Sequence, residues 1–205
     1  MLFFPCTMYK KPSYRKCCYM PVTKNRLYLL ILCSLFAALC AIGAFIKVPL
    51  AWLPITLQTF FSTLAGLLLG KKWGTVSVVV YLLLGLIGLP IFTQGGGIGY
   101  VTKPTFGFLL GLAPATFCTG LLFERSRKSW SSAFFASLAG AVILYVVGLP
   151  YFYGIMTLYL QQAMTVSQLF AVYCLPTLPG DVIKCIVCAS VVGRLRTALS
   201  QKLPV

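Results

Sequence analysis

The chain has 205 residues, of which 60% are hydrophobic and only 9% are charged, and its mean hydropathy is +0.94. A soluble domain carries about 25% charged residues, so this composition indicates an integral membrane protein and excludes an ordinary soluble enzyme. The formal net charge of +15 would suit nucleic acid. The basic residues, however, occur in short clusters between apolar runs, which membrane topology explains better than a nucleic-acid surface does.

Residue types also limit the chemistry. The sequence has no histidine and two acidic residues, which leaves little material for hydrolytic or metal-dependent catalysis. Most of the nine cysteines lie in apolar runs, where cysteine behaves as a small hydrophobe. Cys17 and Cys18 are adjacent and lack the spacing of metal ligands. We therefore expect a membrane protein that is not an enzyme, with no cofactor and no metal site.

The apolar runs predict an all-α protein with six transmembrane helices. Residues 1–26 are polar and basic and are expected to form a cytoplasmic tail, for which disorder is one interpretation. The first apolar run is about a full span and exceeds the core of a signal peptide. We expect a transmembrane domain over 27–198 and a short cytoplasmic tail over 199–205. The predicted spans are 27–46, 54–70, 73–89, 104–123, 131–158 and 175–195.

The basic residues predict the orientation in the cytoplasmic membrane. With the N-terminus inside, the inner segments after the tail carry Lys71, Lys72, Arg125, Arg127, Lys128, Arg194, Arg196 and Lys202. The outer segments hold only Lys47 and Lys103. The positive-inside rule therefore places both termini in the cytoplasm.

A glycine-rich segment follows the third predicted span. Gln94, Gly95, Gly96, Gly97 and Gly99 cannot form a regular helix, and Pro104 then begins the next apolar run. Unpaired backbone groups are costly in lipid, so this loop must line a cavity or be covered by protein. It lacks the Gly-Lys-Ser/Thr end of a phosphate loop. We expect a binding site at the outer face.

Small residues recur four apart on three of the predicted spans. These pairs are Ala37 with Ala41, Gly66 with Gly70, and Gly107 with Gly111. Such spacing lets helix backbones approach closely, so we expect a compact bundle. The pattern does not say which pair faces a partner protein.

The sixth predicted span contains Asp181 and Lys184, which share a helix face because they are three apart. Charges inside a membrane span are expensive and usually functional. One interpretation is an ion pair that only fixes helix packing. The other is a hydrogen-bonding pair for a cyclic urea or amide, in which the carboxylate accepts N–H bonds and the ammonium donates to a carbonyl. Gln58 and Tyr81 are further polar candidates in the second and third spans.

The order of these motifs resembles the BioY family, the biotin-binding substrate component of energy-coupling factor (ECF) transporters. The resemblance rests on Pro-Ile-Thr-Leu-Gln at 54–58, Tyr-Leu-Leu-Leu-Gly-Leu-Ile-Gly-Leu-Pro-Ile-Phe at 81–92 and Leu-Pro-Gly-Asp-Val-Ile-Lys at 178–184. It covers about residues 27–195. It implies the six-helix substrate-component bundle, with biotin held at the extracellular side beneath the outer loops.

The resemblance also implies roles for individual residues. Gln58, Asp181 and Lys184 would contact biotin, and Tyr81 would occupy the polar position of the third helix. Many relatives have a loop arginine that pairs with the biotin carboxylate, but residues 93–102 contain none. The charge would then come from Lys103 or Lys47, or from backbone N–H groups of the segment that includes Gly96 and Gly97.

The resemblance implies partners as well. The small-residue face of Ala37 and Ala41 is similar to the surface that meets a transmembrane coupling subunit, which works with ATPase subunits. A vitamin-uptake component is therefore favoured. A structural or channel-type membrane protein would need no ligand, and a membrane enzyme would have to use Asp181 and Lys184 as its acid–base pair.

Overall fold

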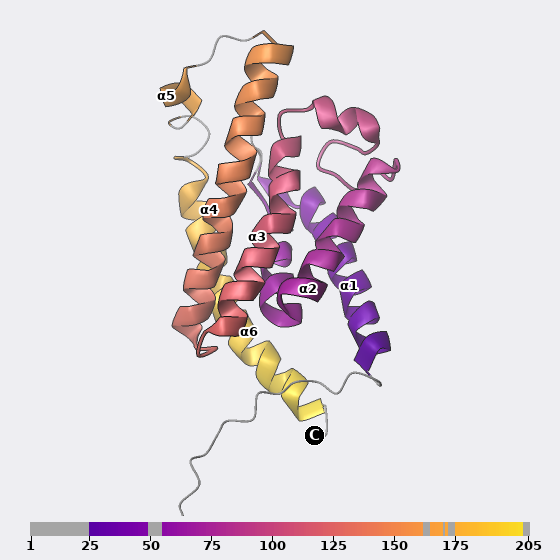
Figure 1. Ribbon diagram of the computed structural model, residues 1–205, viewed down its shortest axis with the longest axis vertical. Helices are drawn as coiled ribbons and strands as arrows, with labels where there is room; N and C mark the ends of the chain where they lie inside the picture. Colours follow the sequence, from indigo (N-terminus) through magenta and orange to yellow (C-terminus); the bar gives the residue numbers. More distant parts are fainter. Residues whose placement is uncertain (1–24, 49–54, 162–164, 170, 172–174, 203–205) are drawn as a thin grey trace, which may run out of the picture.

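The computed structural model describes residues 25–48, 55–161, 165–169, 171 and 175–202. Almost all of the predicted N-terminal tail, 1–26, lies outside the described residues, and so does the end of the predicted C-terminal tail. Figure 1 shows long helices that run roughly along the long axis of the molecule. The all-α class is confirmed for the described part of the chain apart from one short antiparallel strand pair.

The long helices are α1 (Asn25–Phe45), α2 (Gln58–Leu86), α3 (Phe106–Arg125), α4 (Trp130–Gly154) and α6 (Leu178–Lys202). The short elements are the strands β1 (Lys47–Val48) and β2 (Ile55–Thr56), the 3₁₀ helix η1 (Ile98–Thr102), the π-helical segment η2 (Ile155–Tyr159) that extends α4, and α5 (Val166–Gln168). Within the described residues, four helices are long and apolar enough to cross a membrane: Leu27–Phe45, Gln58–Leu86, Phe106–Arg125 and Trp130–Tyr159.

The second and third predicted spans form one element, α2, which is broken at Gly70. This residue has φ 78° and ψ −179°, a backbone conformation that favours glycine, so the chain reverses without a linker. The carboxylate of Glu124 lies where a Cβ of residue 70 would be. Glu124 Oε1 accepts a hydrogen bond from the Lys71 backbone N–H at 2.9 Å and so caps the second half of α2.

The two halves of α2, 58–69 and 71–86, run in opposite directions. In the first half of α1, the Cys33 thiol donates to the Trp73 carbonyl at 3.2 Å. Near the end of α1, a Cβ on Gly43 would lie 2.9 Å from the Gln58 nitrogen. A Cβ on Gly74 would lie 2.8 Å from the Ala65 carbonyl, although a continuous helix would hold these residues, nine positions apart, at about 13 Å. The halves form a helical hairpin beside α1.

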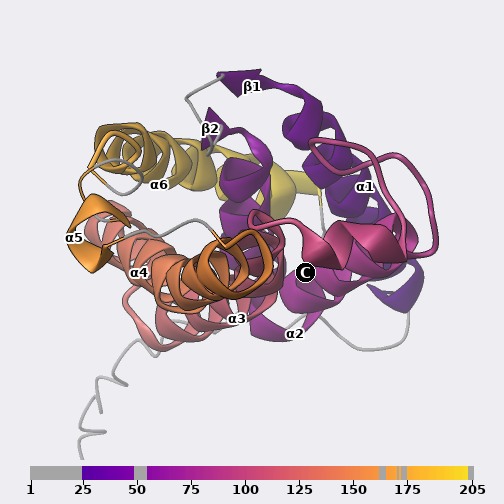
Figure 2. The same cartoon turned by 90° about the horizontal axis from the view of Figure 1, so that it is seen from above.

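The bundle has two different ends. The loop end carries η1, the loop before it, the strand pair and the start of α6 (Figures 1 and 2). The basic end carries the joint at Gly70, the turn between α3 and α4, and the C-terminal half of α6. Its cations are Lys71, Lys72, Arg125, Arg127, Lys128, Arg194 and Arg196.

Close backbone contacts hold the helices together, as the small-residue pattern predicted. A Cβ on Gly66 would lie 2.7 Å from the Thr116 carbonyl of α3, and one on Gly111 would lie 3.1 Å from the Leu144 carbonyl of α4. Ala37 is 6% exposed and lies in the core cluster near the loop end, with Ala41 packed against that cluster. Both alanines are thus contacts within the bundle, and their role at a partner surface stays a prediction.

Candidate functional site

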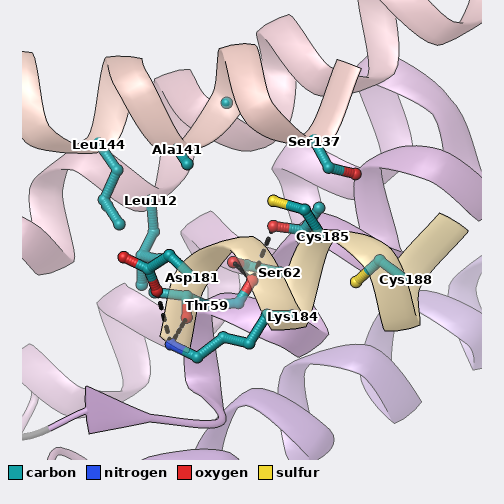
Figure 3. A pocket seen from close by; sticks show the side chains of 12 residues that line it. Thr59, Ser62, Leu112, Ser137, Ala141, Leu144, Asp181, Lys184, Cys185 and Cys188 are labelled. Atoms are coloured by element: carbon teal, nitrogen blue, oxygen red, sulfur yellow. Dashed lines mark hydrogen bonds and ion pairs between the residues drawn. The ribbon is translucent and has the colours of Figure 1, made fainter. Parts of the chain in front are cut away.

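The charged pair of α6 lies at the centre of a hydrogen-bonded network near the loop end (Figure 3). Lys184 Nζ lies 2.8 Å from Asp181 Oδ1 and also donates to Thr59 Oγ1 at 2.9 Å. Asp181 Oδ2 accepts a hydrogen bond from the Tyr145 hydroxyl, whose oxygen also lies 2.8 Å from Thr177 Oγ1. The side chains of the pair are each 15% exposed. The first turns of α6 thus bring the pair against α2 and α4.

Asp181 and Lys184 line a cavity of about 30 Å³, which we call cavity 1. Figure 3 shows Leu112 and Leu144 beside Asp181, with the Lys184 side chain reaching Asp181 and Thr59 from the other side. The full lining is Thr59, Ser62, Thr63, Leu112, Ser137, Gly140, Ala141, Leu144, Asp181, Lys184, Cys185 and Cys188. The pair is therefore partly open to a space and is not sealed within side-chain packing.

A second cavity of about 50 Å³, cavity 2, adjoins the first, because Thr59 and Leu112 line both. Its other lining residues are Thr56, Gln58, Thr93, Thr105, Phe108 and Leu109. Five of its eight lining residues carry a polar group, but apolar atoms, threonine methyl groups included, form most of its surface, as they do in small-molecule sites.

Two polar atoms at cavity 2 have no hydrogen-bond partner among the described residues. They are Gln58 Nε2 and Thr105 Oγ1. The two residues are 3% and 8% exposed, respectively. Thr105 precedes the first residue of α3, yet its hydroxyl does not cap that helix. Leaving a buried polar group unpaired costs about 1–3 kcal/mol, so such groups usually have a partner that a bound molecule or water supplies.

Tyr81 supports the glycine-rich loop from beneath. It is fully buried, and its hydroxyl donates to the Ile91 carbonyl at 3.2 Å. The loop seats Phe92 against Gly85, where any Cβ would overlap the ring. Tyr81 lines neither cavity, so the structure does not bring it together with Asp181 and Lys184.

The remaining predicted residues also belong to the loop and not to the cavity walls. The Gly97 N–H donates to the Gly85 carbonyl at 2.7 Å, and Gly96 packs against the Leu89 carbonyl. Lys103 Nζ donates to the Gln94 carbonyl at 3.2 Å. Of the sequence-predicted residues, the structure therefore brings Gln58, Asp181 and Lys184 to the two cavities, and the others to the loop above them.

Three residues of the site were not predicted from the sequence: Thr59, Thr105 and Tyr145. Tyr145 offered a signal, because a tyrosine in the middle of an apolar span needs a partner for its hydroxyl. The threonines offered none, since threonine in a membrane helix usually bonds its own backbone. Thr59 and Thr105 become site residues only because separate helices meet at the loop end.

The fold is similar to that of a solved substrate component of a transporter. The structure is described as the S-component for biotin from an ECF-type ABC transporter, and the TM-score is 0.74 at 27% identity. The match covers 87% of this chain and 95% of the other. The fold of this chain is therefore similar to that of an ECF-type substrate component.

The family model described as the BioY family matches residues 16–201, and this chain belongs to that family. A probable biotin transporter BioY from Lysinibacillus sphaericus is 42% identical over 167 residues, covering 81% of this chain and 85% of that protein. The biotin transporter BioY of Thermotoga maritima is 36% identical over 168 residues, covering 82% and 95%.

Proposed function

We propose that this chain is the biotin-binding membrane component of a vitamin-uptake system. The observation that carries the proposal is the arrangement of polar groups around two adjoining cavities. Asp181 and Lys184 offer an acceptor and a donor side by side in one cavity, and Gln58 and Thr105 offer unpaired polar atoms in the other. A cyclic urea with an apolar ring and tail needs such a combination. The family membership supports the same ligand.

The urea ring belongs beside the charged pair. The Asp181 carboxylate accepts one ring N–H group, and the Lys184 ammonium donates to the neighbouring ring carbonyl, because an ammonium has three donors and only two are used here. Gln58 and Thr105 contact the ligand in cavity 2, and Tyr81, Gly96 and Gly97 shape the loop that covers it.

Binding requires the site to open. The two cavities hold about 30 and 50 Å³, whereas sites for small organic ligands occupy about 300–1,000 Å³. Phe108, Leu109 and Leu112 are the apolar residues that line cavity 2, and Leu112 also lines cavity 1. Displacement of these side chains and of the loop merges the two cavities into one site.

We further propose six membrane crossings with both termini in the cytoplasm. The halves of α2 are then separate short crossings, and α6 is the sixth despite its charges. The basic end is the cytoplasmic end by the positive-inside rule, and the loop end is extracellular. This supports the predicted transmembrane domain at 27–198 between two cytoplasmic tails, in the cytoplasmic membrane of the cell.

The proposed partners are a transmembrane coupling subunit and its ATPase subunits, which would supply the energy for transport. The fold of an ECF substrate component supports them in general terms. Radiolabelled biotin uptake, measured in cells with and without co-expressed coupling subunits, tests this. Uptake that rises with the coupling subunits supports the proposal.

Direct binding is tested by calorimetry of the purified chain. Heat of binding at micromolar biotin is expected. The absence of binding, in a sample whose melting transition shows that it is folded, would contradict the proposal.

A further inference from the structure

The start of α4 and the C-terminal half of α6 meet in an exposed seam at the basic end of the bundle. Trp130 Nε1 donates to Ser190 Oγ at 3.2 Å and so ties the first residue of α4 to α6. The Trp130 ring stacks on the Phe134 ring, with centroids 5.8 Å apart and planes 3° apart. Trp130 is nevertheless 52% exposed, and Phe135 is 65% exposed. Aromatic surface is therefore open at the seam.

Three exposed cations lie within a few positions of the contact between Trp130 and Ser190. Arg127 and Lys128 come just before α4. Arg194 follows Ser190 by four positions, so these two residues share one face of α6. Positive charge from two separate segments of the chain therefore collects at the seam.

No acidic side chain is left to pair with these three cations. The whole chain has two acidic residues, and they pair with Lys71 and Lys184. The positive charge of the seam is therefore balanced by anions from outside the protein.

The position of Trp130 sets the depth of these charges in a bilayer. The span that begins at Trp130 runs to Tyr159 and is long and apolar enough to cross a membrane. Tryptophan at the end of such a span lies at the level of the lipid headgroups. The three cations therefore lie level with lipid phosphates, and the exposed ring of Phe135, further along the helix, lies level with the acyl chains.

We propose that this seam binds an anionic phospholipid of the leaflet that meets the basic end. The phosphate accepts charge-assisted hydrogen bonds from Arg127, Lys128 and Arg194. The acyl chains pack on the exposed rings of Trp130 and Phe135. A zwitterionic lipid binds less well, because its own ammonium is repelled by the three cations. The bound lipid bridges α4 and α6 at a surface separate from cavities 1 and 2, so the inference does not depend on the proposed function.

The test is native mass spectrometry of the full chain released from micelles that contain equal amounts of dioleoylphosphatidylglycerol and dioleoylphosphatidylcholine. These lipids share their acyl chains and differ in headgroup charge. The unaltered chain is expected to retain phosphatidylglycerol preferentially. The double variant Lys128→Gln with Arg194→Gln is expected to lower the ratio of bound phosphatidylglycerol to phosphatidylcholine by about fivefold for each cation removed. Raising the salt concentration is expected to lower the ratio for the unaltered chain, because exposed charges are screened.

The matched control is the double variant Lys72→Gln with Arg196→Gln, which also removes one lysine and one arginine from the basic end. Arg196 lies away from the seam, because its guanidinium is 5.4 Å from the centre of the Phe123 ring. The lipid ratio of this variant is expected to equal that of the unaltered chain. The melting temperatures of both double variants in phosphatidylcholine alone show that each is folded.

Three outcomes overturn the lipid site. An equal fall of the lipid ratio in the two double variants means that the charge of the whole basic end attracts lipid without a site at the seam. A preference for phosphatidylglycerol that persists in folded Lys128→Gln with Arg194→Gln means that the lipid binds elsewhere. No preference in the unaltered chain, together with biotin uptake that falls only in that variant when coupling subunits are present, assigns the seam to a protein partner instead.

Discussion

Asp181→Asn separates a binding role of the charged pair from a packing role. In the structure the carboxylate accepts hydrogen bonds from Lys184 and Tyr145. The amide keeps one acceptor oxygen but loses the charge. Hydrogen bonds to charged groups contribute about 1.5–3 kcal/mol and those between neutral groups about 0.5–1.5, so biotin is expected to lose about 1–2 kcal/mol. That corresponds to a dissociation constant about 5- to 30-fold higher.

The assay is calorimetric titration of purified variants with biotin. Glu124→Gln is the matched control, because Glu124 is the other acidic residue of the chain and pairs with Lys71 Nζ at 3.5 Å at the basic end. Its affinity for biotin is expected to stay unchanged. Asp181→Asn also leaves Lys184 without a counter-charge, so the melting temperature of the variant is measured beside its affinity to separate a loss of folding from a loss of binding. Unchanged affinity of folded Asp181→Asn would refute the reasoning and leave the pair a packing role only.

Three further substitutions test separate parts of the structure. Gly70→Ala is expected to lower the melting temperature by about 2–12 °C, because a side chain at φ 78° and ψ −179° costs about 1–3 kcal/mol and its Cβ meets Glu124. Thr105→Val is expected to weaken biotin binding by about 0.5–1.5 kcal/mol without lowering the melting temperature, because the lost hydroxyl has no partner in the protein. Tyr145→Phe is expected to weaken binding less than Asp181→Asn, because the ion pair to Asp181 remains.

Each of these has a contrary outcome. For Gly70→Ala the control is Gly154→Ala, where a Cβ has open space, and equal effects of the two would contradict the strain argument. A melting temperature that falls in Thr105→Val would show that the hydroxyl stabilises the fold. An affinity loss in Tyr145→Phe that exceeds the loss in Asp181→Asn would mean that the hydroxyl contacts the ligand itself.

Hydropathy predicted the long helices well where an apolar run ends at a proline, a glycine or a charge. The spans 104–123 and 131–158 agree with α3 and with Trp130–Tyr159. The predicted spans 54–70 and 73–89 correspond to the two halves of one element, α2, because only Gly70 interrupts its helical backbone. Sequence alone does not show that a single glycine with positive φ reverses the chain there.

The sequence predicted only the part of the site that depends on spacing along a single helix. Spacing along one helix placed Asp181 and Lys184 on one face, and the structure pairs them at 2.8 Å. Contacts between helices carry no such local signal. The hydroxyls of Tyr145 and Thr105 reach the site from α4 and from the residue before α3. The Tyr81 hydroxyl instead donates to the Ile91 carbonyl, and this contact depends on how the glycine-rich loop folds back.

The joint at Gly70 makes the first half of α2 a lever. Its far end carries Gln58 and Thr59, which line cavity 2. Its other end is the joint at Gly70, where Glu124 accepts a hydrogen bond from the Lys71 backbone N–H. The 12 positions of 58–69 span about 18 Å at the rise of an α-helix, so a tilt of about 10° swings Gln58 by about 3 Å. A small rotation at the Gly70 joint thereby becomes a displacement of about 3 Å at cavity 2.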